Sequence, residues 1–260
     1  MKKFFVPVLF SLWCISFPVQ AVNITVGEGE TRVGEVDILE NGGDTAVNRG
    51  QYNVQKVQIA NGSLTNYGTI TEVFSEDEDN YSDLIHVLAS GGSVTNYGRI
   101  EGTTTINYGS FTAMDGSYIT NLDLYNNTND SLAVLNVMGN VTVDGYLYTD
   151  SSAEIIFTLG GSINMLGHDL ENWGARLVLL VDEIISADDT TTSFRYLEKK
   201  DFFTNVGDGN ITDNTTIVLR DSQGNETTRT AGELYTVPEP ASAAFTLLAL
   251  AGLASCRRRK

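Results

Sequence analysis

The chain has 260 residues and a formal net charge of −17 at pH 7, from 16 basic and 33 acidic residues. This acidity excludes nucleic-acid binding, because a negative surface repels phosphate. The cysteines and prolines all lie near the two ends: Cys14, Cys256, Pro7, Pro18, Pro238 and Pro240. Residues 22–236, which we call the body, therefore contain neither type and must be held together by burial and backbone pairing without disulfides.

Residues 1–21 have the three-part pattern of a signal peptide. Lys2 and Lys3 form a basic start, residues 4–17 are largely apolar, and small residues surround the expected cleavage point. We expect signal peptidase to cleave after Ala21. The body keeps 10 basic and 32 acidic residues, a formal charge of −22, because six basic residues and one acidic residue fall in the terminal segments.

Internal repetition is the main signal in the body. The sequence GSLTNYGTI at residues 62–70 returns as GSVTNYGRI at residues 92–100. A shorter copy, INYGSF, follows at 106–111, and a degenerate copy, GSYITNL, at 116–122. Self-similarity at short period is typical of architectures built from stacked repeats.

The composition of the repeats favours strands. Thr, Val, Ile and Tyr alternate with Asn and Gly around the copies, without a helical period. The absence of proline suits continuous strand stacking, because proline would remove a backbone donor from the ladder. We therefore predict an all-β fold, a parallel β-solenoid (β-helix) over residues 22–171, in which each rung covers the inner face of the next.

Equivalent side chains of such a stack lie roughly 4.8 Å apart, so the repeats predict two columns. The asparagines are expected to point inward as an amide ladder: Asn66, Asn96, Asn107 and, in the degenerate copy, Asn121. The tyrosines are expected to point outward as an aromatic stripe: Tyr67, Tyr97 and Tyr108. The stripe has two interpretations, cross-rung stacking that stabilises the strands or a glycan-binding platform on which a sugar ring packs.

Residues 74–83 are expected to form a loop outside the solenoid, because they contain the charged run SEDEDN and lengthen one repeat. Asp77, Asp79 and Asp83 are the calcium candidates, although Tyr81 occupies a position where an EF-hand loop needs a ligand. The alternative is a solvated acidic loop. We expect no other cofactor, because the two histidines lack partners at zinc-site spacing.

From residue 172 the composition changes, and residues 172–236 are expected to form a β-rich cap with a short helix. Before this point, strands are expected at 132–137, 141–143 and 154–159. After it, a strand is expected at 176–181. All four runs are rich in Val, Ile and Leu. The helix is expected over Ser193–Thr204. A hairpin is expected over 211–229, with its turn at 221–225.

Residues 237–260 combine a Pro-Glu-Pro motif, an apolar run and a basic cluster. The motif and cluster are Val237, Pro238, Glu239, Pro240 and Ala241, followed by Arg257, Arg258 and Arg259. This arrangement resembles the PEP-CTERM sorting signal of exopolysaccharide-producing Gram-negative bacteria. The resemblance implies that an exosortase-type membrane protease recognises and removes this segment, after which the body is released or attached at the cell surface.

The apolar run agrees with that topology. Residues 241–256 as a helix would be about 24 Å long, which is short for a hydrocarbon core of roughly 30 Å, although small residues and flanking charges permit marginal insertion. The terminal arginines should stay cytoplasmic, which leaves the body outside the inner membrane. We expect a transmembrane segment that anchors the protein only before processing.

The TNYG copies also make the body resemble the β-solenoids of autotransporter passengers. By analogy of fold, the expected function is that of an exported, non-catalytic structural or adhesive protein of the cell surface or extracellular matrix. Its expected partners are signal peptidase, the exosortase-type protease, and extracellular polysaccharide or other surface proteins. The alternative is a carbohydrate-active β-helix enzyme, a polysaccharide lyase or glycosidase with carboxylates in a groove, or a glycan-binding module.

Overall fold

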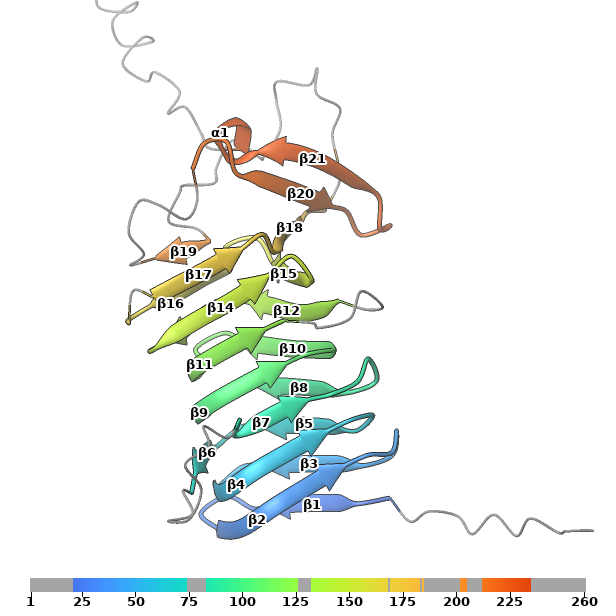
Figure 1. Ribbon diagram of the computed structural model, residues 1–260, viewed down its shortest axis with the longest axis vertical. Helices are drawn as coiled ribbons and strands as arrows, with labels where there is room; N and C mark the ends of the chain where they lie inside the picture. The colour runs from blue at the N-terminus through green and yellow to red at the C-terminus, as the bar shows by residue number, and fades with distance from the viewer. Residues whose placement is uncertain are drawn as a thin grey trace, which may run out of the picture.

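The computed structural model of the chain describes residues 21–73, 83–125, 132–167, 169–182, 184, 202–204 and 212–234. These residues form two long sheets that run side by side along one stack (Figure 1). Successive strands in each sheet pair in parallel, and only the last pair of the first sheet is antiparallel among the described strands. The predicted parallel β-solenoid is confirmed.

The described residues contribute ten strands to the first sheet. In spatial order they are β1 (Asn23–Val26), β3 (Thr45–Asn48), β5 (Ser63–Asn66), β8 (Ser93–Asn96), β10 (Gly109–Met114), β12 (Ala133–Met138), β15 (Ala153–Phe157), β18 (Arg176–Leu180), β20 (Thr216–Arg220) and β21 (Glu226–Thr230).

In the second sheet, the described part of the chain forms eleven strands. They are β2 (Thr31–Leu39), β4 (Gln51–Ile59), β6 (Thr69–Glu72), β7 (Ile85–Val87), β9 (Arg99–Ile106), β11 (Tyr118–Leu124), β13 (Asn140–Val143), β14 (Tyr146–Asp150), β16 (Ser162–Met165), β17 (Asp169–Trp173) and β19 (Phe203–Thr204). Each rung passes from the first sheet to the second and then returns to start the next rung.

The register confirms the alignment of the two best sequence copies. Ser63 pairs with Ser93 and Asn66 with Asn96, so the sequence offset of 30 between the copies is one step of the first sheet. Neighbouring steps are shorter, with offsets of 22 from β1 to β3 and 18 from β3 to β5. The longer step therefore contains an insertion.

The insertion interrupts the second sheet, as the expected loop at 74–83 requires. Strands β6 and β7 both pair with β4, and both also pair with β9. Glu72 of β6 pairs with Val54, and Ile85 of β7 pairs with Val57. The two valines lie close together on β4, whereas the charged run separates Glu72 from Ile85 in the sequence. Residues 74–82 themselves lie outside the described residues.

The alignment of the third and fourth copies was wrong. Ser110 pairs with Ser93, and Ala113 pairs with Asn96, so residue 113 and not residue 107 continues the asparagine column. The stretch from Asn96 to Asn107 is too short for a full rung, because the step from β8 to β10 extends from Asn96 to Ala113. The Asn-Tyr-Gly of the third copy instead belongs to the return turn between β9 and β10.

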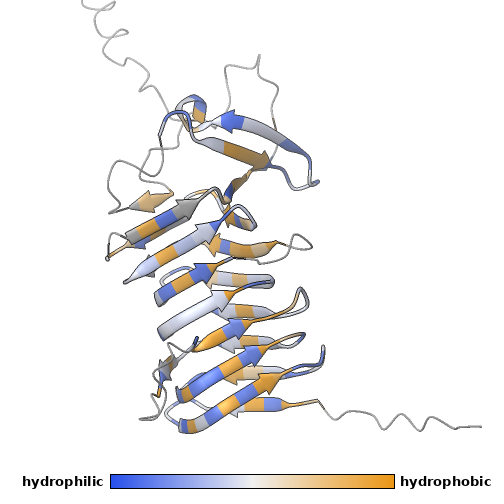
Figure 2. Ribbon diagram, in the orientation of Figure 1, coloured by the Kyte–Doolittle hydropathy of each residue, from blue (hydrophilic) through white to orange (hydrophobic). Residues whose placement is uncertain are grey.

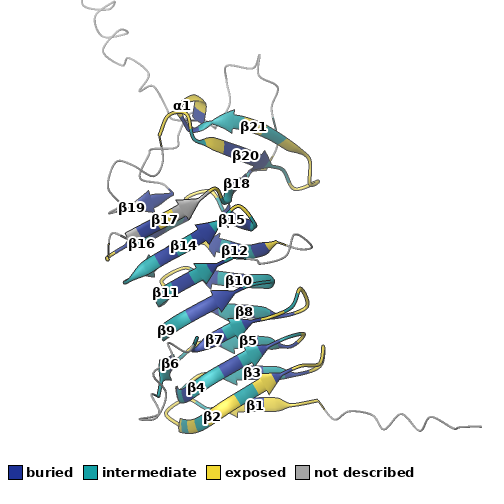
Figure 3. Ribbon diagram, in the orientation of Figure 1, coloured by how far each residue is buried: buried dark blue, intermediate teal, exposed yellow. Residues whose placement is uncertain are grey.

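One hydrophobic core runs through the stack from Ile24 to Leu234. The strands alternate apolar and polar residues, as Figure 2 shows, and the apolar ones point inward. In β12, for example, Ala133, Leu135 and Val137 are buried, while Val134 and Asn136 between them are half-buried. Figure 3 shows the same alternation, with exposed residues concentrated in turns and in β2. Burial of this kind contributes roughly 1.5–3 kcal/mol for each large apolar side chain.

The stack continues beyond residue 171, where the solenoid was expected to end. Strand β18 pairs in parallel with β15, and β20 pairs in parallel with β18 across a long step that extends from Leu177 to Ile217. The predicted hairpin is confirmed, since β21 turns back antiparallel to β20. The Asp221 carboxylate accepts the backbone N–H groups of Gln223 and Asn225 at 2.9 and 2.8 Å, which fixes the turn.

The helix predicted over Ser193–Thr204 was wrong at its C-terminal end, where the chain is extended. Residues 193–201 lie outside the described residues, but Phe203 and Thr204 form β19, which pairs in parallel with β16. Phe202 and Phe203 instead pack edge-on against Phe157, with ring centroids 5.0 and 5.6 Å apart. Burial of aromatic surface in the core favours the extended chain here.

The expected signal peptide, apart from Ala21, and the whole expected sorting segment at 237–260 lie outside the described residues. The expected C-terminal hydrophobic helix lies there too. The described part of the chain contains one short helix, α1 (Ala231–Leu234), and no helix in that part is long and apolar enough to cross a membrane.

Candidate functional site

An asparagine ladder occupies the corner where the chain passes from the first sheet to the second. The Nδ2 of Asn48 donates to Oδ1 of Asn66 at 2.7 Å, and the Nδ2 of Asn66 donates to Oδ1 of Asn96 at 2.8 Å. All three side chains are buried. Asn107 and Asn121 are outside this ladder, because Asn107 follows β9 and Asn121 pairs with Thr103 within the second sheet.

Each ladder amide also holds its own turn. The Oδ1 of Asn66 accepts the N–H of Gly68 at 3.2 Å, and its Nδ2 donates to the carbonyl of Arg99 at 3.0 Å. A Cβ at Gly68 would lie 2.1 Å from the carbonyl oxygen of Gly50, so the turns approach each other too closely for any side chain there. The sequence signal for a rung corner is therefore Asn-x-Gly, which also marks Asn48 and was missed because Arg49 replaces the tyrosine.

Outside this corner, two of the three predicted stripe tyrosines stack. The rings of Tyr67 and Tyr97 are 4.6 Å apart and inclined by 14°, and Arg49 lies over Tyr67 with its Cζ 4.9 Å from the ring centre. Tyr108 lies at the return turn between β9 and β10, on the other side of the rung, so its place in the stripe was wrong. The corner column thus consists of Arg49, Tyr67 and Tyr97.

The calcium candidates divide between the described and undescribed parts of the chain. Asp77 and Asp79 lie outside the described residues, so a calcium site there stays a prediction. Asp83 is described, and its carboxylate accepts the hydroxyl of Thr105 at 2.7 Å. The described residues contain no group of three or more His, Cys, Asp or Glu arranged to hold a metal ion.

Asp83 belongs instead to a polar cluster on the outer side of the second sheet. Its other members, which together with Asp83 we call the polar face, come from β7, β9, β11, β14 and the residues next to them: His86, Thr105, Asn107, Asp123, Tyr125, Tyr146 and Tyr148. The sheet register aligns four of them in one row across adjacent strands, in the order His86, Thr105, Asp123, Tyr148.

One half of the polar face is a chain of hydrogen bonds around His86. The Nδ1 of His86 is 3.4 Å from the Asp83 carboxylate, and its Nε2 donates to Oδ1 of Asn107 at 2.8 Å. Thr105 is fully buried although its row points away from the core, so the side chains around it cover this part of the sheet. The cluster is therefore packed and ordered, unlike a freely solvated charged surface.

The other half contains Asp123 and the tyrosines. The pKa of Asp123 is raised to about 6, mainly because the carboxyl group is buried. A hydrogen bond from Tyr146 at 3.2 Å opposes this shift, and the nearby Asp83 carboxylate adds to it. Burial also raises the pKa of the Tyr125 hydroxyl, and the two carboxylates add to that effect. The ring of Tyr125 meets Tyr148 edge-on, with centroids 6.3 Å apart.

The repeats did not reveal the polar face, because its residues belong to no repeated motif. A weaker signal is present in LDLY at 122–125 and YLY at 146–148, where leucines alternate with polar or aromatic residues. Leu122, Leu124 and Leu147 are fully buried, so the residues between them must face outward. Only the register then shows that these outward residues are neighbours.

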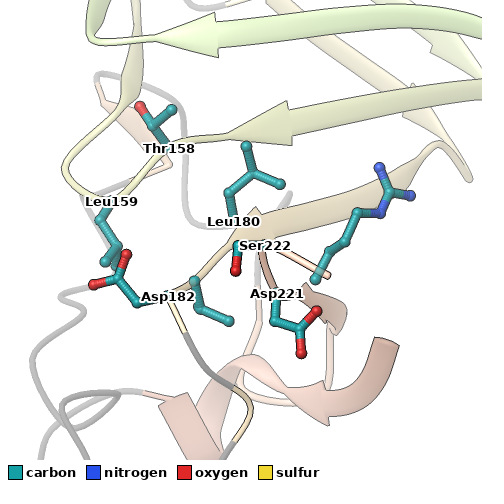
Figure 4. A pocket seen from close by; sticks show the side chains of 8 residues that line it. Thr158, Leu159, Leu180, Asp182, Asp221 and Ser222 are labelled. Atoms are coloured by element: carbon teal, nitrogen blue, oxygen red, sulfur yellow. The ribbon is translucent and has the colours of Figure 1, made fainter. Parts of the chain in front are cut away.

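A hollow of about 400 Å³ lies near the C-terminal end of the stack, beside the hairpin of β20 and β21. Figure 4 shows Leu159, Leu180, Asp182 and Asp221 among the side chains that line it. Arg220, also in the lining, is already bound to Glu154 at 2.9 Å. The hollow therefore combines an apolar wall with two carboxylates, Asp182 and Asp221, and an arginine that is already paired.

The ion pairs near this hollow stabilise the last rungs. Glu154 is buried and accepts hydrogen bonds from Arg176 at 2.8 Å and from Arg220, while Glu226 of β21 binds both arginines. These contacts join β15, β18, β20 and β21 across the first sheet. Hydrogen bonds from the two arginines lower the pKa of Glu226.

No family model, curated protein or solved structure matches this chain. The fold alone therefore defines its class, a parallel β-solenoid with a buried asparagine corner and a polar face on its second sheet.

Proposed function

We propose that the protein is an exported structural or adhesive β-solenoid of the surface of a Gram-negative bacterium. The continuous core from Ile24 to Leu234 carries this proposal, because it makes the described body one stack that buries its apolar side chains without disulfides. Such a stack presents long lateral faces to neighbouring molecules. The hairpin of β20 and β21 closes one end of the first sheet, in the manner of a terminal cap.

The address of the protein is part of the same proposal. Residues 1–21 direct export, and residues 237–260 act as a PEP-CTERM-type signal that an exosortase-type protease removes at the inner membrane. The support is the sequence pattern alone: a basic and apolar start, and a Pro-Glu-Pro, apolar run and arginine cluster at the other end. The body then meets extracellular polysaccharide or other surface proteins.

Mass spectrometry of the protein isolated from the cell surface tests the address. We expect a mature chain that begins at Val22 and lacks Arg257–Lys260, and we expect Glu239→Ala to leave an unprocessed precursor in the inner membrane. A matched variant in the body, Glu28→Ala, should be processed normally. A surface protein that retains Arg257–Lys260 would contradict the sorting proposal.

A second candidate function, recognition of or action on a glycan, is favoured by the polar face. Aromatic rings beside carboxylate and amide groups are the side chains that bind sugar rings and their hydroxyls. A carboxyl group with a pKa of about 6 is also what a glycosidase needs as a general acid. Incubation with bacterial exopolysaccharide, followed by analysis of its chain length, separates a lyase or glycosidase from a protein that only binds.

A further inference from the structure

We propose that the polar face binds a sugar that carries a protonated amine. This inference deepens the proposed surface function by giving the class of glycan that the protein holds, and it depends on that function only for access to the ligand. It rests on the charge of the cluster, on the spacing of its rings and on the direction of its hydrogen-bonding groups.

The charge of the polar face favours a cation. Asp83 and Asp123 both lie in it, and the Asp83 carboxylate disfavours ionisation of Asp123, Tyr125 and Tyr146. An ammonium group placed between the two carboxylates would remove their repulsion and would replace the water that Asp123 loses on burial. It would also lie against tyrosine rings, whose faces attract cations.

The spacing of the rings favours a sugar over an isolated alkylammonium group. Tyr146 and Tyr148 stand at alternate positions of β14 and both face outward, because Leu147 between them is fully buried. Outward side chains at this spacing stand about 6.8 Å apart, which is wide enough for one pyranose ring. The edge-on contact of Tyr125 with Tyr148 extends the aromatic surface to β11.

The polar face also contains fixed hydrogen-bonding groups beside these rings. The amide of Asn107, held by the Nε2 of His86, and the hydroxyl of Tyr146, held by Asp123, are both half-buried and fixed in place. Fixed amide and hydroxyl groups match the alternating donors and acceptors of sugar hydroxyls. A lysine side chain would satisfy the carboxylates but would make no use of the remaining hydrogen-bonding capacity of these two groups.

The energetic state of Asp123 agrees with a role in binding. An ionised carboxylate is disfavoured at this half-buried position, whereas an uncharged asparagine of the same shape would avoid that cost. A residue that opposes stability at its own position, within an otherwise well-packed sheet, is a sign of a binding site.

Calorimetric titration of the full chain at pH 7 and physiological salt tests the proposal. The probes are a hexamer of glucosamine, the matching hexamer of N-acetylglucosamine, which carries no charge, and a lysine tetramer. We expect the glucosamine hexamer to bind at least about tenfold more tightly than either of the other two. Asp123→Asn and Tyr148→Ala should each weaken this binding by about tenfold, while Tyr67→Ala, in the corner column, should change it less than about twofold.

Three results would overturn the proposal. Equal binding of the N-acetylated hexamer would exclude the ammonium group as the recognised feature, and equal binding of the lysine tetramer would indicate a basic peptide as the ligand. Unchanged affinity in Asp123→Asn, with a melting temperature no lower than that of the parent, would exclude this face. A correctly sorted surface protein that fails these titrations refutes only this inference, whereas a binding protein that is never exported refutes only the proposed function.

Discussion

The asparagine corner and the polar face show two uses of polar side chains in one solenoid. At the corner, Asn48, Asn66 and Asn96 repeat in register; two hydrogen bonds join the three amides, and each amide also bonds to its own turn. On the polar face no residue repeats, and the Asp123 carboxylate stands where burial opposes its charge. Repetition with every group paired indicates a stabilising role, while an unrepeated and unfavourable group indicates binding.

The largest expected effect is at the centre of the corner. Asn66→Ala removes the hydrogen bonds to Asn48, Asn96, the Arg99 carbonyl and the Gly68 N–H, and it leaves buried partners without their bonds. We expect a loss of about 3–4 kcal/mol in the free energy of unfolding, measured by urea denaturation. The exposed Asn61, whose Nδ2 donates to the carbonyl of Glu40, serves as the control.

For Asn61→Ala we expect a loss below about 1 kcal/mol. If the two asparagine variants lose equal stability, the ladder does not hold the corner and the contrast between the two regions fails.

The next effect concerns the close approach of the turns. In Gly68→Ala the new Cβ would lie 2.1 Å from the Gly50 carbonyl oxygen, so the rungs must move apart, at a cost of about 2–3 kcal/mol. The control is Gly42→Ala, because its Cβ would meet its nearest atom, the carbonyl oxygen of Asn61, only at 4.0 Å. Thermal unfolding should show a clear loss for the first variant and almost none for the second.

The difference between the regions also explains what the sequence could predict. The repeats predicted the solenoid, the pairing of the two best copies and the stacked pair Tyr67 and Tyr97, because a repeated corner imposes the same local residues on every rung. They misplaced Asn107 and Tyr108, because the same Asn-Tyr-Gly sequence occurs at both ends of β9. The copy at 96–98 forms the ladder corner before β9, and the copy at 107–109 forms the return turn after it. Local sequence specifies a turn but not which corner of the rung it forms.

The polar face could not be predicted in this way. His86, Thr105 and Asp123 are neighbours only because β7, β9 and β11 pair in one particular register, and connections of different length separate them in the sequence. Alternation shows that each residue faces outward, but it does not show which outward residues are adjacent. Pairing of distant strands therefore creates the candidate site.

A smaller effect is expected from the charge of Asp123. Because its folded-state pKa of about 6 exceeds the ordinary value of 3.8, the folded protein retains a proton that the unfolded chain has released between those pH values. The stability contributed by this group therefore falls as the pH rises from about 4 to 6, and the loss persists above that range. After allowance for its partial exposure, Asp123→Asn should be more stable than the parent by about 1 kcal/mol at pH 8.

The two proteins should have equal stability below about pH 4, where Asp123 is protonated in both states. Urea denaturation between pH 3.5 and 8 measures the free energy of unfolding of both proteins. Subtracting one value from the other removes the effects of Asp83 and the other carboxylates, which the two proteins share. Asp182→Asn, at an exposed carboxylate beside the hollow, is the control for removing one carboxylate elsewhere in the body. A parent-to-variant difference that is constant with pH would show that Asp123 is not held in the disfavoured state described for the polar face.

The smallest effect is the coupling between the corner tyrosines. Tyr67 and Tyr97 stack with centroids 4.6 Å apart, so a double-mutant cycle with alanine should give a coupling free energy of about 0.5–1.5 kcal/mol. The same cycle for Tyr97 and Tyr108 should give a value near zero, because the two lie at opposite turns of the rung. Coupling in the second cycle as large as in the first would restore the three-membered stripe and would place Asn107 back in the asparagine column. The paired outcome thus tests the register on which both the corner and the polar face depend.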